Sequence, residues 1–540
     1  MEVAHLTTRR KRYLSHAAVI AVMMLIGALS AHHQGQDLSW DLLNYHFYNP
    51  WAFVHGRMGF DYAPAGGGTY ANPMLDVLDY FFRANFRPII AGLCIGAVQG
   101  LNGYVVFAIA HLSLRKYLPD QRLRFAVSLG LGVASLFGAT AYGEMGASQG
   151  DTIISLFVLG SLLLLLYAAN SDNRNNARIQ RLAAYALIGM AVGLKLTALV
   201  FAIPLIIAGA FIGDGIREKL RFGLQHVGAF ILGILVIAGF WYAKMWALFH
   251  NPVFPYYNAI FRSPYLPPVN LSDTRWFPHT LHDKILWPFI IARLQNVAAE
   301  PLFRDPRLAI MLTTVAIAVV VYIIRRFIQG KSLRIELTDA ILLVFVVLSY
   351  VIWQIQFSYY RYASPLEILS FTVVAVAAYK FMKSKIVVTV GLAALCIAAT
   401  MYTVPLNFGR IPWQTENFGP NLSKQLSVVN NGIVLLPVRD PMGFLVPYLP
   451  KNTRAISVLG YATANSLQRQ PIASAIQDAQ KHGKQFYALI SNQSLNTDPT
   501  AFTDVGYKVT KCQVLDTWIT QYASAGRTWY SVCALEKIQA

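Results

Sequence analysis

Long apolar runs alternate with short polar connections over roughly the first four hundred residues of the chain. A helix needs about 20 predominantly apolar residues to cross the hydrocarbon core of a bilayer. The pattern therefore predicts an α-helical polytopic membrane protein with about eleven transmembrane helices. The predicted helices lie at approximately 17–31, 89–113, 125–142, 152–169, 183–194, 196–212, 226–248, 307–324, 337–353, 363–379 and 386–403.

The pattern changes after about residue 404. Short runs rich in β-branched and aromatic residues replace the long ones, and a stretch at 471–482 has helical periodicity. We therefore expect a transmembrane domain over residues 1–403 and a small C-terminal α/β domain over residues 404–540. The strand-like runs lie at 432–438, 454–460, 484–491, 508–518 and 528–538.

The composition supports a membrane protein, since 55% of the 540 residues are hydrophobic and only 13% are charged. The net charge of +19 comes largely from basic clusters that occupy every second connection between the apolar runs, so we read it as a topology signal and not as a nucleic-acid-binding surface. This places the N-terminus in the cytoplasm and the C-terminus outside it. The clusters are Arg9/Arg10/Lys11/Arg12, Arg115/Lys116/Arg122/Arg124, Arg174/Arg178/Arg181, Arg217/Lys219/Arg221, Arg325/Arg326/Lys331/Arg334 and Lys380/Lys383/Lys385.

The extracytoplasmic side then carries the three long polar segments. They are the loop 32–88, the loop 249–306 and the tail, whereas the cytoplasmic loops contain only about ten residues each. Any chemistry is therefore expected outside the cytoplasm. The first apolar run resembles a signal peptide, but we expect it to be retained as a signal anchor because further spans follow. Cys512 and Cys533 could form a disulfide if the tail lies outside the cytoplasm.

One span assignment depends on the charge pattern. Residues 183–212 are flanked by basic clusters on both sides, so the chain must enter and leave the membrane within about thirty residues. We expect two short helices with Lys195 near their tip. A charged side chain at such a depth is costly unless it is paired or functional.

Candidate chemistry begins in the first outer loop. Its opening stretch, DLSWDLLNYH, contains Asp37, Asp41, Tyr45 and His46, and an Asn-Pro pair follows at Asn72. Later segments add GASQGD at the start of the fourth run, GLKLTAL in the hairpin, HNPVFPYYN at 250–258 and YYRYASPLEIL at the entry to a late helix.

Together and in this order, these motifs resemble the C-type superfamily of membrane glycosyltransferases. That superfamily includes protein O-mannosyltransferases and the aminoarabinose transferases of lipid A. The resemblance implies an acidic general base in the first outer loop and a polyprenyl-phosphate-linked sugar as donor. Many relatives have two adjacent acids in that loop, whereas here Asp37 and Asp41 are four residues apart. The Asp-x-x-x-Tyr-His spacing favours Asp41, with Asp37 in reserve.

Transfer of a sugar from such a donor requires a base that takes the proton of the acceptor hydroxyl. It also requires cations that stabilise the departing phosphate, and both must be shielded from bulk water. The resemblance also implies a second acid, at the start of the fourth run, and leaves open whether Asp41 and Asp151 hold a divalent metal ion. The predicted site residues are Asp41, Asp37 and Asp151 for catalysis, Lys195 and Arg361 for the donor phosphate, and Tyr45, His46, Asn72 and Tyr360 for the substrate.

Each of these residues also has a structural interpretation. Asp37, Asp41 and Asp151 could cap helices. Lys195 could extend towards the interface and Arg361 could anchor a helix there. The rings of the first loop could form an aromatic belt at the membrane surface.

The sequence thus predicts an inverting glycosyltransferase in the bacterial inner membrane that uses a polyprenyl-phosphate-sugar. Its acceptor would be a lipid, a glycan or a protein, and nucleic acid is not an expected partner. A transporter or flippase of lipid-linked sugars is the alternative, although transporters commonly show internal repeats and need no acid-bearing outer loop. A sensor or scaffold would explain the tail but would leave Lys195 without a role.

Overall fold

The computed structural model describes residues 2–210, 212, 216–329, 335–437, 440–458, 469–492, 502–522 and 528–539. Some sequence predictions fall outside these residues. They concern two basic residues, Lys331 and Arg334, and parts of three apolar runs, at Phe211, Val438, Leu459 and Gly460. The described chain forms two compact units, each made of three segments. One contains 1–34, 92–238 and 273–408, and the other contains 35–91, 239–272 and 409–540. The predicted boundary near residue 404 stays a prediction.

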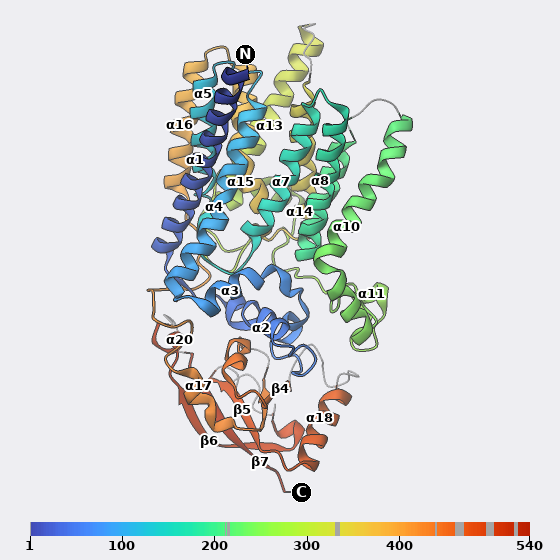
Figure 1. The fold of residues 1–540 in the computed structure, drawn as a ribbon, viewed down its shortest axis with the longest axis vertical. Coiled ribbons are helices and arrows are strands. Elements are labelled where there is room, and N and C mark those ends of the chain that lie inside the picture. The colour runs from blue at the N-terminus through green and yellow to red at the C-terminus, as the bar shows by residue number, and fades with distance from the viewer. Residues whose placement is uncertain are drawn as a thin grey trace. The chain divides into compact units, whose positions relative to one another are not determined.

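Each predicted apolar run contains a helix in the structure (Figure 1). Within the described residues, eight helices are long and apolar enough to cross a membrane, and α9 is a shorter apolar helix. The predicted class of polytopic helical membrane protein is confirmed. The helices are α1 (Glu2–Gln34), α4 (Pro88–Ser113), α5 (Gln121–Ser135), α6 (Ala139–Gly143), α7 (Asp151–Ala169), α8 (Arg174–Leu194), α9 (Leu199–Gly209), α10 (Ile216–Phe249), α12 (Leu281–Ile291), α13 (Arg307–Ile323), α14 (Leu337–Gln356), α15 (Ser364–Phe381) and α16 (Lys385–Tyr402), with single turns η4 (Leu196–Ala198), η5 (Ile324–Ile328) and η6 (Tyr360–Ala363).

The membrane helices pack around α15. Helix α15 contacts α5, α7, α13, α14 and α16, while α7 packs on α8 and α14 packs on α9. Small residues allow the closest approaches, and a Cβ on Gly27 of α1 would lie 2.1 Å from a carbonyl oxygen of α4. Of the spanning window that includes α15, 83% is buried, against 11% for α10, so α15 is the central helix of this unit.

Two expectations about the membrane helices are wrong. The run 125–142 is not one helix, because α5 ends at Ser135 and α6 begins at Ala139. The buried N–H groups in the first turn of α6 have no partner within the helix and are satisfied by buried carboxylates: Asp305 accepts from Ala139, and Glu367 accepts from Thr140 and Ala141.

The hairpin is also longer than predicted. Its first helix, α8, has 21 residues because it begins at Arg174, where the Asn173 side chain caps its N-terminus. The arginines that were expected to form a connection therefore lie within α8. The second helix is short, as predicted, and Lys195 lies at the break between the two.

The second unit contains a five-stranded mixed sheet in the order β4-β3-β5-β7-β6. Strands β3, β4 and β5 are parallel, and β7 is antiparallel to both β5 and β6. All five strands and helix α18 match the runs predicted in the tail. The strands are β3 (Ile433–Leu436), β4 (Arg454–Ser457), β5 (Phe486–Ser491), β6 (Tyr507–Leu515) and β7 (Tyr530–Lys537), with helices α17 (Leu422–Gln425), α18 (Arg469–Lys481) and α20 (Trp518–Tyr522) and turns η7 (Leu426–Val429), η8 (Gly443–Tyr448) and η9 (Thr503–Val505).

Cys512 and Cys533 are directly opposite each other on β6 and β7 and form a disulfide. The pairing that the sequence allowed is thus present in the structure.

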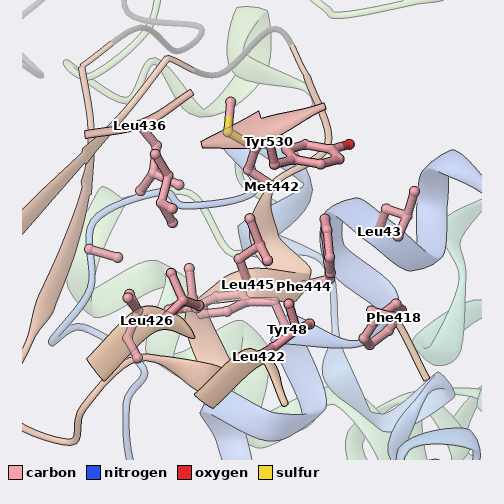
Figure 2. Close-up of a cluster of buried hydrophobic side chains, with 14 of the residues drawn as sticks. Leu43, Tyr48, Phe418, Leu422, Leu426, Leu436, Met442, Phe444, Leu445 and Tyr530 are labelled. Atoms are coloured by element: carbon pink, nitrogen blue, oxygen red, sulfur yellow. The ribbon is translucent and has the colours of Figure 1, made fainter. Parts of the chain in front are cut away.

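The loop after α1 belongs to this unit and packs on one face of the sheet (Figure 2). Leu43 and Tyr48 of the loop share a hydrophobic core with Leu436, Phe444 and Tyr530 of the tail. Short elements build the loop, and further ones complete the unit. They are β1 (Gln36–Asp37), η1 (Leu42–His46), α2 (Tyr48–Val54), η2 (Gly66–Tyr70), η3 (Pro73–Leu75), α3 (Val77–Asn85), α11 (Asn258–Phe261) and β2 (Arg410–Ile411).

Candidate anion site and first-loop acids

Asp151 is the first residue of α7 and follows Gly150, whose φ of +78° turns the chain into the helix. Its side chain is buried. One carboxylate oxygen, Oδ1, lies 2.5 Å from Lys195 Nζ, and the other, Oδ2, lies 3.2 Å from Arg361 Nε. The structure thus brings together three residues that the sequence predicted for one site, although they are 44 and 210 positions apart along the chain.

Lys195 is held at the break in the α8–α9 hairpin. Its backbone is extended, with φ −150° and ψ 115°, so helix α8 ends at Leu194 and a new turn begins at Leu196. Besides Asp151, the ammonium contacts the carbonyl oxygen of Gln149 at 3.4 Å and lies 4.9 Å from the centre of the Tyr362 ring. The lysine is therefore paired within the protein, with 17% of its side chain exposed.

Arg361 belongs to η6, which connects α14 to α15. Three rings surround its guanidinium, those of Tyr359, Tyr362 and Phe408, at 5.2 to 5.7 Å. Such rings fix the plane of the guanidinium. The contact with Asp151 runs through Nε, and a guanidinium carries four more N–H donors on its two Nη atoms.

Sequence reasoning missed a second acid beside this pair of cations. Glu144 lies between α6 and α7, is fully buried, and accepts the N–H of Thr152 through Oε2 at 3.0 Å. Burial raises the pKa of the Glu144 carboxyl to about 8, and the Asp151 charge acts in the same direction. A glutamate within the otherwise apolar and small-residue stretch GATAYGEMGASQG was the available signal.

Polar side chains of α4 hold the segment that carries these two acids. Gln99 accepts the N–H of Gly146 at 2.7 Å and donates to the carbonyl oxygen of Ala147 at 3.2 Å, while Asn102 donates to Thr152 O at 2.8 Å. The position of Asp151 and Glu144 is therefore determined by the helix core and not by a mobile loop.

Tyr360, which was predicted to contact the substrate, is fully buried. Its N–H donates to Ala298 O at 2.8 Å, and its ring lies 4.7 Å from that of Phe303. A substrate role for Tyr360 stays a prediction.

The two acids of the first loop differ in their surroundings. Asp37 is buried, pairs with Arg83 at 3.5 Å, and lies opposite Arg410 in the β1–β2 ladder. Burial alone would raise the pKa of Asp37, but Arg83, Arg410 and the N–H of Ser39 hold it below its ordinary value of 3.8. A carboxylate with a lowered pKa is a weak base, which supports a structural role for Asp37.

Asp41 is half-buried and immediately precedes η1, a π-helical turn that contains Tyr45 and His46. The rings of Tyr45 and His46 are 4.2 Å apart, and His46 Nδ1 lies 2.6 Å from Asp76 Oδ1. Asn72 caps η3 by accepting the N–H of Met74 at 3.1 Å. Asp41, Tyr45, His46 and Asn72 therefore lie in one loop, and their catalytic and substrate roles stay predictions.

Comparison with known proteins gave two similar solved structures, whereas no protein-family model and no curated protein matches the chain. Both are structures of ArnT. They come from Cupriavidus metallidurans, one bound to undecaprenyl phosphate and one in the apo state, and each is 13% identical to this chain with a TM-score of 0.46. The matches cover 96% and 97% of this chain and 97% and 98% of the ArnT chains.

A divalent metal ion held by Asp41 and Asp151 stays a prediction, and the contacts of Asp151 are those of an ion-paired carboxylate. Both of its oxygens are engaged by cations, and within the described residues no group of three or more His, Cys, Asp and Glu side chains is placed to hold a metal. Two positive side chains against one buried carboxylate instead suit an anion. No step proposed below involves a metal.

Replacing Asp37 by Asn is expected to lower the free energy of unfolding by about 2 kcal/mol at pH 7, because a buried charge-assisted contact is lost while Arg83 keeps Asp79. Since the pKa of Asp37 is lowered by folding, this stabilisation is fully present above the unfolded-state pKa and is lost as the pH falls through the lower folded-state value. Thermal unfolding of the purified protein between pH 7 and pH 3 measures the difference.

The matched control is Asp478→Asn, which removes an exposed carboxylate on α18 and should leave the melting temperature unchanged. A difference between wild type and Asp37→Asn that persists unchanged at pH 3 would contradict the ion-pair explanation.

Proposed function

We propose that this protein is a membrane glycosyltransferase. It transfers a sugar from a polyprenyl-phosphate-linked donor to an acceptor hydroxyl at the extracytoplasmic face, with inversion at the anomeric carbon. The observation that carries the proposal is the meeting of Lys195 and Arg361 at Asp151, at the start of the membrane helix α7. A lipid-linked donor presents its phosphate from the bilayer, so its cationic partners must belong to the membrane domain.

The charges around Asp151 favour an anion. Among these three described side chains, Asp151 contributes one negative charge and Lys195 and Arg361 contribute two positive charges, so the cations outnumber the acid. An unbalanced charge in a low-dielectric site strongly attracts an ion of opposite sign. Arginine in particular can bind two phosphate oxygens at once through its planar fork.

The reaction then needs one base and two cations. Asp41 takes the proton from the acceptor hydroxyl, whose oxygen attacks the anomeric carbon from the face opposite the phosphate. The bond between that carbon and the phosphate oxygen breaks, and its electron pair stays on the departing polyprenyl phosphate. Lys195 and Arg361 stabilise the negative charge that develops there. A single displacement of this kind inverts the anomeric configuration.

A transfer assay in proteoliposomes tests the proposal. The full chain is supplied with undecaprenyl phosphates that carry different radiolabelled sugars, together with a bacterial lipid and glycan extract as the acceptor. We expect label to enter the acceptor fraction in a new glycosidic bond while free undecaprenyl phosphate appears. Movement of the labelled lipid across the membrane without any new glycosidic bond would instead show a flippase and refute the proposal.

A further inference from the structure

Glu144 is a buried titratable group that the proposed reaction does not use. Its side chain is fully enclosed, so it cannot touch a substrate in this conformation. Oε2 accepts the N–H of Thr152, and within the described residues Oε1 is buried with no hydrogen-bond partner. If Glu144 were ionised, this oxygen would carry charge without a hydrogen-bond partner, which costs free energy. Protonated Glu144 carries no charge, so this cost does not arise.

Charged groups face Glu144 from three other elements. They are Asp151 at the start of α7, Lys195 at the break after α8, and Arg361 in η6, and their charges all act on the Glu144 carboxyl. Tyr362 of η6 is another titratable group beside this cluster, and its ring lies against Lys195. With Glu144 protonated, the cluster keeps its single positive charge. With Glu144 ionised, the two acids cancel the two cations and the cluster is neutral.

We propose that Glu144 is a positioning residue that sets the affinity of this site for a phosphate anion through its own charge state. The proton on Glu144 preserves the positive charge that Lys195 and Arg361 present, and loss of that proton removes it. This inference rests on the proposed function, since the anion is the phosphate of the lipid-linked donor. It adds a regulation of donor binding by pH, exerted by a residue that does not contact the donor.

The burial of Glu144 determines in which direction the phosphate affinity changes with pH. Because burial raises the pKa of Glu144 to about 8, the carboxyl is protonated at neutral pH and ionises as the pH rises through that value. Affinity for a phosphate should therefore be highest below pH 8 and fall above it. Adding one negative charge beside the cations that hold the anion weakens binding on the order of tenfold.

The experiment measures binding of farnesyl methyl phosphate to the full chain in nanodiscs between pH 6.5 and 9.5. This phosphodiester carries one negative charge throughout that range, so any pH dependence belongs to the protein. We expect the Kd of the wild type to rise about tenfold with a midpoint near pH 8. Glu144→Gln should bind tightly at every pH, and Glu144→Asp should keep a pH dependence with a shifted midpoint.

The matched control is Glu336→Gln, at the opposite end of α14 from Arg361, where the carboxylate pairs with Lys116. It should keep the wild-type profile. A wild type with one affinity across the range, or an unchanged pH profile in Glu144→Gln, overturns this inference and leaves the proposed function standing. No binding at any pH overturns the anion site itself, and the proposed function with it.

Discussion

Replacing Asp41 by Asn is expected to lower the rate of sugar transfer about a thousandfold, which is the typical contribution of a general base. Asparagine keeps the shape of the side chain but cannot accept the proton of the acceptor hydroxyl. The KM for the donor should stay within about twofold, because Asp41 does not hold the phosphate in the proposed reaction. Initial rates of label transfer in proteoliposomes at saturating donor measure the effect.

Asp37→Asn is the informative comparison, since it changes the other acid of the same loop in the same way. We expect it to reduce the melting temperature and to leave most of the transfer rate of the folded fraction, because Asp37 is already paired with Arg83. If Asp37→Asn instead abolishes transfer in well-folded protein while Asp41→Asn stays active, the base is Asp37.

Replacing Lys195 by Met is expected to weaken donor binding about a hundredfold. Methionine fills a similar volume, but the site loses one of its two cations and Asp151 is left with Arg361 alone. Removing one partner of a buried charge pair costs about 2 to 5 kcal/mol, and about 1.4 kcal/mol corresponds to a tenfold change. The Kd for farnesyl methyl phosphate, a phosphodiester like the donor, measured in nanodiscs at pH 7, reports the loss.

Lys380→Met is the matched control for this variant. Lys380 is paired with Asp339 at 2.6 Å in the last turn of α15, so the substitution removes a similarly buried Lys–Asp pair at the far end of that helix from Arg361. It should lower stability without changing donor affinity. Equal losses of affinity in both variants would mean that Lys195 acts through folding alone.

The elements of this fold were predictable because their periodicity is strong. Long apolar runs specify membrane helices, and continuous or alternating apolar runs such as 484–491 specify strands of a covered sheet. The ends of the helices were harder to predict from the sequence. Helix α5 ends early because Asp305 and Glu367, more than 160 residues away, satisfy the N–H groups of the next turn, and no local pattern encodes such a partner.

The sequence predicted part of the candidate site. Asp151, Lys195 and Arg361 stood out as charged residues at the ends of apolar runs, and the family resemblance indicated that they act together. Glu144 was overlooked because it belongs to no motif, and its unusual protonation arises from burial and from neighbours that only the folded chain supplies. The pairing of Asp37 with Arg83 could likewise not be predicted, because the sequence pattern does not distinguish the surroundings of the two acids in the loop.

The break between α8 and α9 makes the position of Lys195 sensitive to the length of the chain around it. Each residue of an α-helix turns the chain by about 100° and advances it by about 1.5 Å. One residue inserted into α8 would therefore direct the ammonium away from Asp151 into neighbouring helices, although every side chain of the site would still be present. An insertion in the exposed connection before Arg174 changes neither the rotation nor the depth of Lys195. The hairpin should thus tolerate changes of residue type on its lipid-facing side far better than changes of length.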